Sequence, residues 1–106
     1  MALPSLTPEQ RQAALRKAAL ARQVRAEVKN RLKNSGATLA EVIAEAKQNE
    51  AVAKMKVLDL LQSVPGIGKI SAQEIMERLN IAPSRRIRGL GQNQVRDLIA
   101  EFNRRI

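Results

Sequence analysis

The stretch from Ser63 to Ser71, SVPGIGKIS, combines two closely spaced glycines with a lysine, a pattern that can bind phosphate. Glycine lets the backbone turn sharply and approach a ligand closely, because no Cβ stands in the way. A helix that begins near Lys69 would add free backbone N–H groups and the positive end of its dipole. Gly66, Gly68 and Lys69 are therefore candidate phosphate-binding residues.

Two nucleotide-binding motifs can be excluded for this stretch. A Walker loop requires glycine where Ser63 stands, and serine or threonine where Ile70 stands. A dinucleotide fingerprint requires glycine at Ser71 and a preceding β-strand, and the sequence has neither. The helical patterns on both sides favour a helix–hairpin–helix, although a plain glycine turn between packed helices would explain the same residues.

Residues 82–94, APSRRIRGLGQNQ, form a second basic cluster. Pro83 and two glycines disfavour a helix there, so Arg85, Arg86 and Arg88 are expected to project from a loop and to reach phosphates or a groove. Gln92 and Asn93, near the start of the last helix, could contact phosphate or base edges. A flexible, solvated loop is the alternative, but no acidic residue lies between positions 77 and 97 to balance the arginines.

A third basic cluster follows one side of the helix expected over residues 7–35. At about 100° per residue, five cations fall within an arc of about 80°. They are Arg11, Arg22, Arg25, Lys29 and Lys33, and an apolar stripe of Leu20, Val24, Val28 and Leu32 adjoins them. This face is either a second surface for a polyanion or a solvated face beside a packing face.

Helix signals account for nearly all of the chain. Thr7, Pro8 and Gln10 predict an N-terminal capping box, and residues 34–36 predict the end of that helix. Thr38 and Glu41 predict a second capping box, and residues 52–64 read as one further helical segment. Two more amphipathic helices are expected, one on Ile70, Ile75, Met76 and Leu79, the other on Val95, Leu98, Ile99 and Phe102. No segment alternates with period two, so the prediction is an all-α fold in one domain over residues 1–106.

The amino-acid composition of the chain limits the kinds of molecule that it is expected to bind. With 19 basic and 10 acidic residues, the net charge is +9 and the isoelectric point near 11.1, which indicates a polyanionic partner. The sequence has no cysteine and no histidine, which argues against disulfides, zinc sites and imidazole catalysis, and we expect no cofactor and no metal cluster. One aromatic residue argues against binding single strands by base stacking. No signal peptide or membrane-spanning segment is evident, so we expect no membrane partner.

Residues 36–63, with three basic and four acidic side chains, look like a nearly neutral structural section.

The stretch from Leu58 to Phe102 resembles a helix–two-turns–helix module, seen in a small-subunit ribosomal protein and in formamidopyrimidine-type DNA glycosylases. Over essentially its full length, from MALPSLTPEQRQAAL onward, the chain resembles the actinobacterial integration host factor family. This resemblance implies a cytoplasmic, nucleoid-associated monomer that binds double-stranded DNA with little sequence preference, compacts or bends it, and supports recombination by phage integrase. It implies no small-molecule substrate.

The resemblance also assigns site residues, in two groups. The hairpin group is Val64, Gly66, Gly68, Lys69 and Ser71, and the group that covers the DNA, here called the lid, is Pro83, Ser84, Arg85, Arg86, Arg88, Gly89, Gly91, Gln92 and Asn93. Hairpin carbonyls in related modules can hold a monovalent cation, so the Val64 carbonyl is a candidate ligand.

An enzyme is not expected. Formamidopyrimidine-type glycosylases use an N-terminal proline as nucleophile, and here two residues precede Pro4. Other hairpin glycosylases place a catalytic aspartate well downstream of the hairpin, where this chain has only Asp97 inside the last helix. Two other functions stay open: a ribosomal-RNA-binding module, and a protein partner of an integrase that acts without binding DNA itself.

Overall fold

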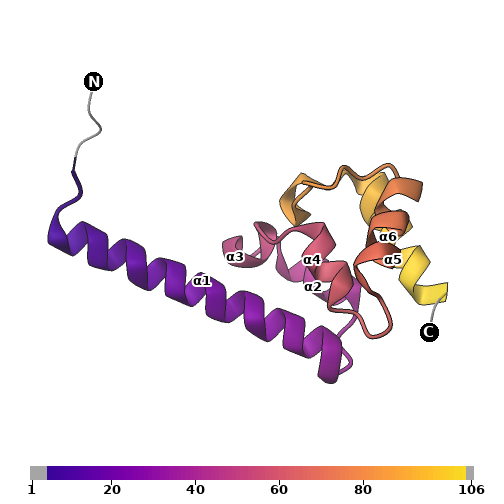
Figure 1. Ribbon diagram of the computed structural model, residues 1–106, viewed down its shortest axis with the longest axis horizontal. Coiled ribbons are helices and arrows are strands. Elements are labelled where there is room, and N and C mark those ends of the chain that lie inside the picture. The colour runs from indigo at the N-terminus through magenta and orange to yellow at the C-terminus, as the bar shows by residue number, and fades with distance from the viewer. Residues whose placement is uncertain (1–4, 105–106) are drawn as a thin grey trace.

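The computed structural model describes residues 5–104, and every regular element in that range is a helix (Figure 1). The prediction of an all-α fold with a long N-terminal helix is therefore confirmed. The elements are α1 (Pro8–Asn34), α2 (Leu39–Glu45), α3 (Glu50–Ala53), α4 (Val57–Gln62), α5 (Lys69–Arg78), the 3₁₀ turn η1 (Ile87–Gly89) and α6 (Gln92–Arg104). Pro4, on which the glycosylase comparison turned, lies outside the described residues.

Both ends of α1 follow from local sequence. The Thr7 hydroxyl accepts the Gln10 amide hydrogen at 3.1 Å, and the Gln10 side chain accepts the Thr7 amide hydrogen at 3.0 Å, so the predicted capping box is confirmed. At the other end, Ser35 donates its N–H to the Arg31 carbonyl, and Gly36 takes a φ of +72° that ends the helix. Thr38 caps α2 by accepting the Glu41 amide hydrogen at 3.2 Å.

The two halves of α1 have different environments. All side chains of residues 8–20 are exposed, and this half extends beyond the other helices (Figure 1). Val28 and Leu32 are buried, and Val24 packs against the same core. The expected apolar stripe is therefore shorter than predicted, because Leu20 remains 62% exposed. Only the second half of α1 is held by packing.

A single apolar cluster joins the second half of α1 to all later helices. Its largest fully buried members are Met55, Leu60, Leu61, Ile75, Met76 and Leu98. Burying one such side chain contributes about 1.5–3 kcal/mol, so this cluster is what positions the surface loops. In α6 the predicted stripe faces this core, with Leu98 and Phe102 buried. Ile70 lies in α5, as expected, but its side chain is 72% exposed and does not join the core.

Residues 52–64 do not form one helical segment, which corrects the sequence prediction. The chain leaves α3 at Lys54 and enters α4 only at Val57, because the residues between pair with the lid. The Ile87 amide donates to the Met55 carbonyl at 2.9 Å and the Val57 amide donates to the Arg85 carbonyl at 3.0 Å, around an antiparallel bridge between Lys56 and Arg86. These tertiary hydrogen bonds replace the ones that a continuous helix would make.

Helices α5 and α6 are joined by a charged pair at the edge of the core. Glu101 is only 6% exposed, and its carboxylate accepts a hydrogen bond from the Arg78 guanidinium. A buried carboxylate requires such a partner, since desolvation disfavours its charge. None of the described helices is both long enough and apolar enough to cross a membrane.

Candidate nucleic-acid interface

The hairpin between α4 and α5 is a tight turn fixed by one apolar anchor. The Ile67 amide donates to the Val64 carbonyl at 3.1 Å, and Gly66 takes a φ of +84°, a conformation that favours glycine. Ile67 is only 9% exposed and holds the turn against the core. The Val64 carbonyl keeps a second lone pair beyond this hydrogen bond. A monovalent cation at this carbonyl remains a prediction.

The start of α5 presents a row of unused donors. Gly68 is the N-cap residue, and no side chain caps the helix. Within the part of the chain that the structure describes, the N–H groups of Gly68, Lys69, Ile70 and Ser71 donate to no protein acceptor. A ten-residue helix adds the positive end of its dipole at the same place. The arrangement suits an anion such as a phosphate.

Space is available where a ligand would approach these donors. A Cβ built on Gly66 or Gly68 meets no atom within 4 Å, and Lys69 is exposed beside them. Gly68 has a φ of −89°, which any residue can adopt. Packing and backbone conformation therefore do not require glycine at position 68, whereas the close approach of a ligand would.

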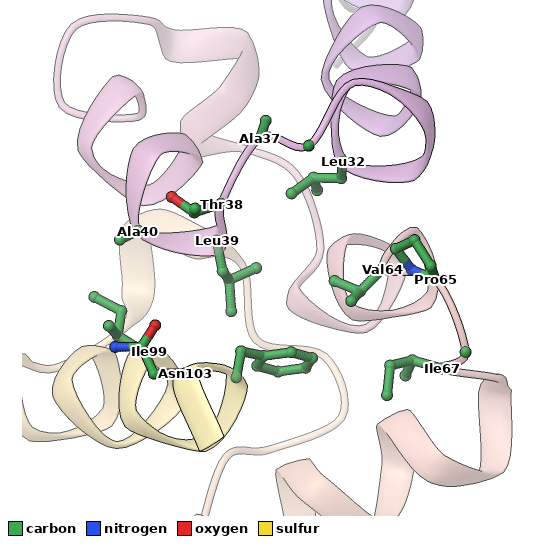
Figure 2. Close-up of a pocket in the computed structure, with 13 residues that line it drawn as sticks. Leu32, Ala37, Thr38, Leu39, Ala40, Val64, Pro65, Ile67, Ile99 and Asn103 are labelled. Carbon is green, nitrogen blue, oxygen red and sulfur yellow. The ribbon is translucent and has the colours of Figure 1, made fainter. Parts of the chain in front are cut away.

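An apolar cavity of about 490 Å³ lies on the inner side of the hairpin (Figure 2). Figure 2 shows Val64 and Ile67 of the hairpin facing it, together with Leu32 at the end of α1 and Ile99 on α6. No charged side chain lines this cavity. The donor residues 68–71 at the start of α5 are not among those that line it.

The lid, residues 83–93, is more ordered than a flexible loop. Ile87 is 4% exposed and anchors the turn η1, while Pro83 and Ser84 lie exposed before it. The Arg85 guanidinium donates to the Gly89 carbonyl, and Arg86 Nη1 donates to the Lys54 carbonyl at 2.6 Å.

The three lid arginines therefore differ. Arg85 and Arg86 each use part of the guanidinium to hold the lid. Arg88 is exposed and makes no hydrogen bond or ion pair with any described residue, so it keeps all five donors for a ligand.

The end of the lid is fastened to α5 by Gln94, a residue that the sequence analysis did not single out. Its side chain accepts the Gly91 amide hydrogen at 2.9 Å and donates to the Asn80 carbonyl at 3.0 Å. Gln92 and Asn93 lie exposed in the first turn of α6, in the position expected for contacts with phosphate or base edges.

The predicted cations of α1 lie on its surface. Arg11, Arg22, Lys29 and Lys33 are exposed, and Arg25 is half-buried. Arg31, on the same helix, forms an ion pair with Glu45 at 2.8 Å and so helps hold α1 against α2.

A small hollow of about 120 Å³ connects α1 with the lid, and five cations line it together with Asp59 and Met55. The cations are Arg25, Lys29, Lys54, Lys56 and Arg86, which we name the basic junction. Lys54 and Lys56 were missed in the sequence, because they belong to a section whose charges nearly cancel. The connection exists because α3 packs against both α1 and η1.

Glu50 of α3 shows how far this positive region extends. Its carboxylate lies 2.8 Å from the Lys54 ammonium, and the hydrogen bond and charge of Lys54 hold the pKa of Glu50 below its ordinary value of 4.5. The charges of Lys17 on α1 and Arg88 in the lid lower the same pKa further. One exposed carboxylate therefore lies within the field of cations from α1, α3 and the lid.

A helix separates the hairpin from the lid, and another separates it from the basic junction. The lid follows the far end of α5, whose ten residues span about 15 Å. The basic junction lies at the start of α4, and the length of this helix, about 9 Å, separates it from the hairpin. In Figure 1 the lid and the α4–α5 loop lie at opposite edges of the body. The hairpin and the lid are therefore separate surface regions.

Comparison with known proteins gives a domain family and relatives that match nearly the full length of the chain. The model of the S13-like H2TH domain matches residues 32–102. The integration host factor of Streptomyces coelicolor is 64% identical over 102 residues, which cover 96% of this chain and 95% of the relative. The integration host factor of Mycobacterium tuberculosis is 55% identical over 102 residues, covering 96% and 97% of the two chains.

A solved structure has the same fold. The structure of sIHF bound to an 8-base-pair palindromic DNA superposes with a TM-score of 0.79 at 60% sequence identity. The match covers 82% of this chain and 98% of that one.

Proposed function

This chain belongs to the actinobacterial integration host factor family and carries its S13-like H2TH domain, and on that basis we propose that it is a nucleoid-associated protein that binds double-stranded DNA. The solved relative, sIHF, is bound to DNA at 60% identity, which supports the same partner here. Binding is through backbone phosphates and has little sequence preference.

The row of free donors at the start of α5 is the observation that carries this proposal. Backbone N–H groups at a helix N-terminus bind phosphate without reading the base, so they provide affinity but no sequence information. Open space above Gly66 and Gly68 lets a DNA strand reach them. Lysine and arginine side chains elsewhere on the surface add contacts whose strength depends on salt.

DNA bending or compaction follows from the positions of the contacts. The hairpin, the lid and the cations of α1 are distributed over a molecule 51 Å long. The exposed first half of α1 carries Arg11 beyond the body, where a curved duplex, or a second duplex, would meet it. The cost of bending DNA would be offset by these added contacts.

Family membership supports two further proposals, that the protein assists phage integrase and that it acts as a monomer in the nucleoid. The proposed protein is an architectural one, with no catalytic role. Stimulation of an integrase by purified protein, together with its mass in solution, tests both proposals. Stimulation that survives loss of DNA binding would mean that the protein acts through integrase alone.

Binding of ribosomal RNA is the second candidate, because the matching family model is described as S13-like. Competition separates the two functions. We expect unlabelled duplex DNA to displace a labelled duplex at lower concentration than folded RNA of equal phosphate content. A reversed order would favour the RNA function.

The proposed phosphate contacts are tested by salt titration of a labelled duplex. The logarithm of the association constant should fall linearly with the logarithm of salt concentration, with a slope near −0.9 for each phosphate contact. Binding that is insensitive to salt would contradict this mode of recognition.

A further inference from the structure

The basic junction is a place where α1 and the lid meet, rather than two separate basic surfaces. Arg25 and Lys29 reach the hollow from α1, and Arg86 reaches it from the lid. Lys54 and Lys56, on the turn between α3 and α4, fill the gap between them. Cations from three segments far apart in sequence therefore surround one small space.

The backbone around the hollow is fixed. The Lys56–Arg86 bridge is flanked by the hydrogen bonds from Ile87 to Met55 and from Val57 to Arg85. Arg86 is also held by its bond to the Lys54 carbonyl. The supporting side chain of Met55 is 2% exposed. The backbone that carries Lys54, Lys56 and Arg86 is thus in place before any ligand binds, which reduces the entropy lost on binding.

The charge of the hollow is unbalanced. Five cations line it, Asp59 is the only carboxylate among the lining residues, and Glu50 pairs with Lys54 from outside, which leaves an excess of three positive charges. Like charges held close together repel each other, and an anion placed between them relieves that repulsion. The structure therefore favours an anionic occupant.

The size of the hollow fits one phosphate group. Its volume of about 120 Å³ is the room that about four water molecules take in the liquid, at roughly 30 Å³ each. A phosphate has four oxygens of similar size to water.

We propose that the basic junction holds one phosphate of the DNA backbone, and that α1 and the lid consequently grip the same duplex. This inference rests on the proposed function. It deepens that function in two ways. Lys54 and Lys56 become part of the DNA interface, and the cations of α1 contact the same duplex as the lid.

Lys29→Gln and Lys56→Gln test the proposal, alone and together. Both side chains are exposed and neither makes a hydrogen bond or ion pair with the described residues, so removing the charge should not unfold the protein. Lys47→Gln is the matched control, because Lys47 is an exposed lysine that does not line the hollow. Affinity for one short labelled duplex is measured by fluorescence anisotropy over a range of salt concentrations.

If one phosphate is shared, each single variant weakens binding two- to threefold, and the double variant weakens it only about threefold at 0.15 M salt, less than the product of the two single effects. The salt slope of the double variant falls by about 0.9 in total, the value for one phosphate contact, and the control changes neither quantity.

Two results would overturn the inference. A slope that falls by about 1.8, with additive single effects, would mean that the two lysines hold separate phosphates. An unchanged affinity in Lys29→Gln, beside a weakened Lys56→Gln, would place α1 on another duplex. Either result leaves salt-dependent binding by the wild-type protein intact, whereas failure of the wild-type protein to bind any duplex would contradict the proposed function itself.

Discussion

The hairpin and the basic junction are two proposed anion-binding regions that lie at the two ends of α4 and are built by different means. The hairpin offers neutral backbone donors within a few consecutive residues, Gly68 to Ser71. The junction offers side-chain charges that come together only when α1, the α3–α4 turn and the lid are packed.

This difference teaches two things about the interface. Backbone donors are fixed in direction and act only at contact distance, so the hairpin sets where a phosphate lies. Charged side chains act over about a Debye length, near 8 Å at physiological salt, so the junction raises affinity and its dependence on salt. Variants that separate geometry from charge should therefore affect the two regions differently.

The largest effect is expected from Gly68→Asp. Aspartate is a favoured N-cap residue, and the extended backbone and open space at this position accept it, so stability should rise by a few tenths of a kcal/mol. The same carboxylate would stand where the phosphate binds and repel it. We expect DNA affinity to fall by at least about tenfold, the loss of one or two phosphate contacts, measured by anisotropy alongside thermal unfolding.

Gly68→Asn is the control for charge, since it has the same shape and caps the helix without a negative charge. Its affinity should fall less than that of Gly68→Asp. If both variants bind DNA as the wild type does, the hairpin is only a turn, and the comparison between the two regions fails.

A smaller loss, about fivefold at 0.15 M salt, is expected from Arg88→Gln. Arg88 makes no bond within the described protein, so the melting temperature should not change. Arg86→Gln provides the contrast, because it also removes the bond to the Lys54 carbonyl and should cost about 1 kcal/mol of stability. Equal melting temperatures for the two variants would show that the Arg86 bond does not hold the lid.

The sequence predicted those features of the molecule that depend on residues close to one another along the chain. The Thr7–Gln10 cap and the Gly36 end of α1 rest on neighbouring residues, and the structure confirms them. The hairpin glycines were found for the same reason.

The features that were missed depend on tertiary contacts. The break at Met55 exists because that residue bonds to the lid, and no signal within residues 52–64 shows it. Charge counts along the chain hid Lys54 and Lys56, since nearby acidic residues balance them in sequence; in space Glu50 pairs with Lys54, whereas Lys56 makes no ion pair with a described residue. The exposure of Ile70 likewise follows from where α5 packs, not from its apolar character.

The smallest effect, and the only gain, is expected from Glu50→Gln. Removing this carboxylate frees Lys54 and removes a negative charge beside the junction, so affinity should rise about twofold at low salt, and less at high salt. Glu41→Gln, a change at an exposed site in the first turn of α2, is the control. A loss of affinity in Glu50→Gln would mean that Glu50 positions Lys54 for DNA.

The pH dependence of stability has a definite sign at Glu50. Because its pKa is lowered in the folded state, the stabilisation that it provides is present above the ordinary value of 4.5 and is lost as the pH falls through the lowered value. Glu50→Gln should remove that loss between the two values, which acid titration of thermal stability can measure.

Amide chemical shifts during titration with one short duplex test the central claim most directly. If both regions bind phosphates of a single duplex, the amide signals of Gly68, Lys69, Ile70 and Ser71 shift together with those of the α3–α4 turn. Both sets should saturate at one duplex per protein. Hairpin amides that do not shift, or two sets that saturate at different ratios of duplex to protein, would contradict the account.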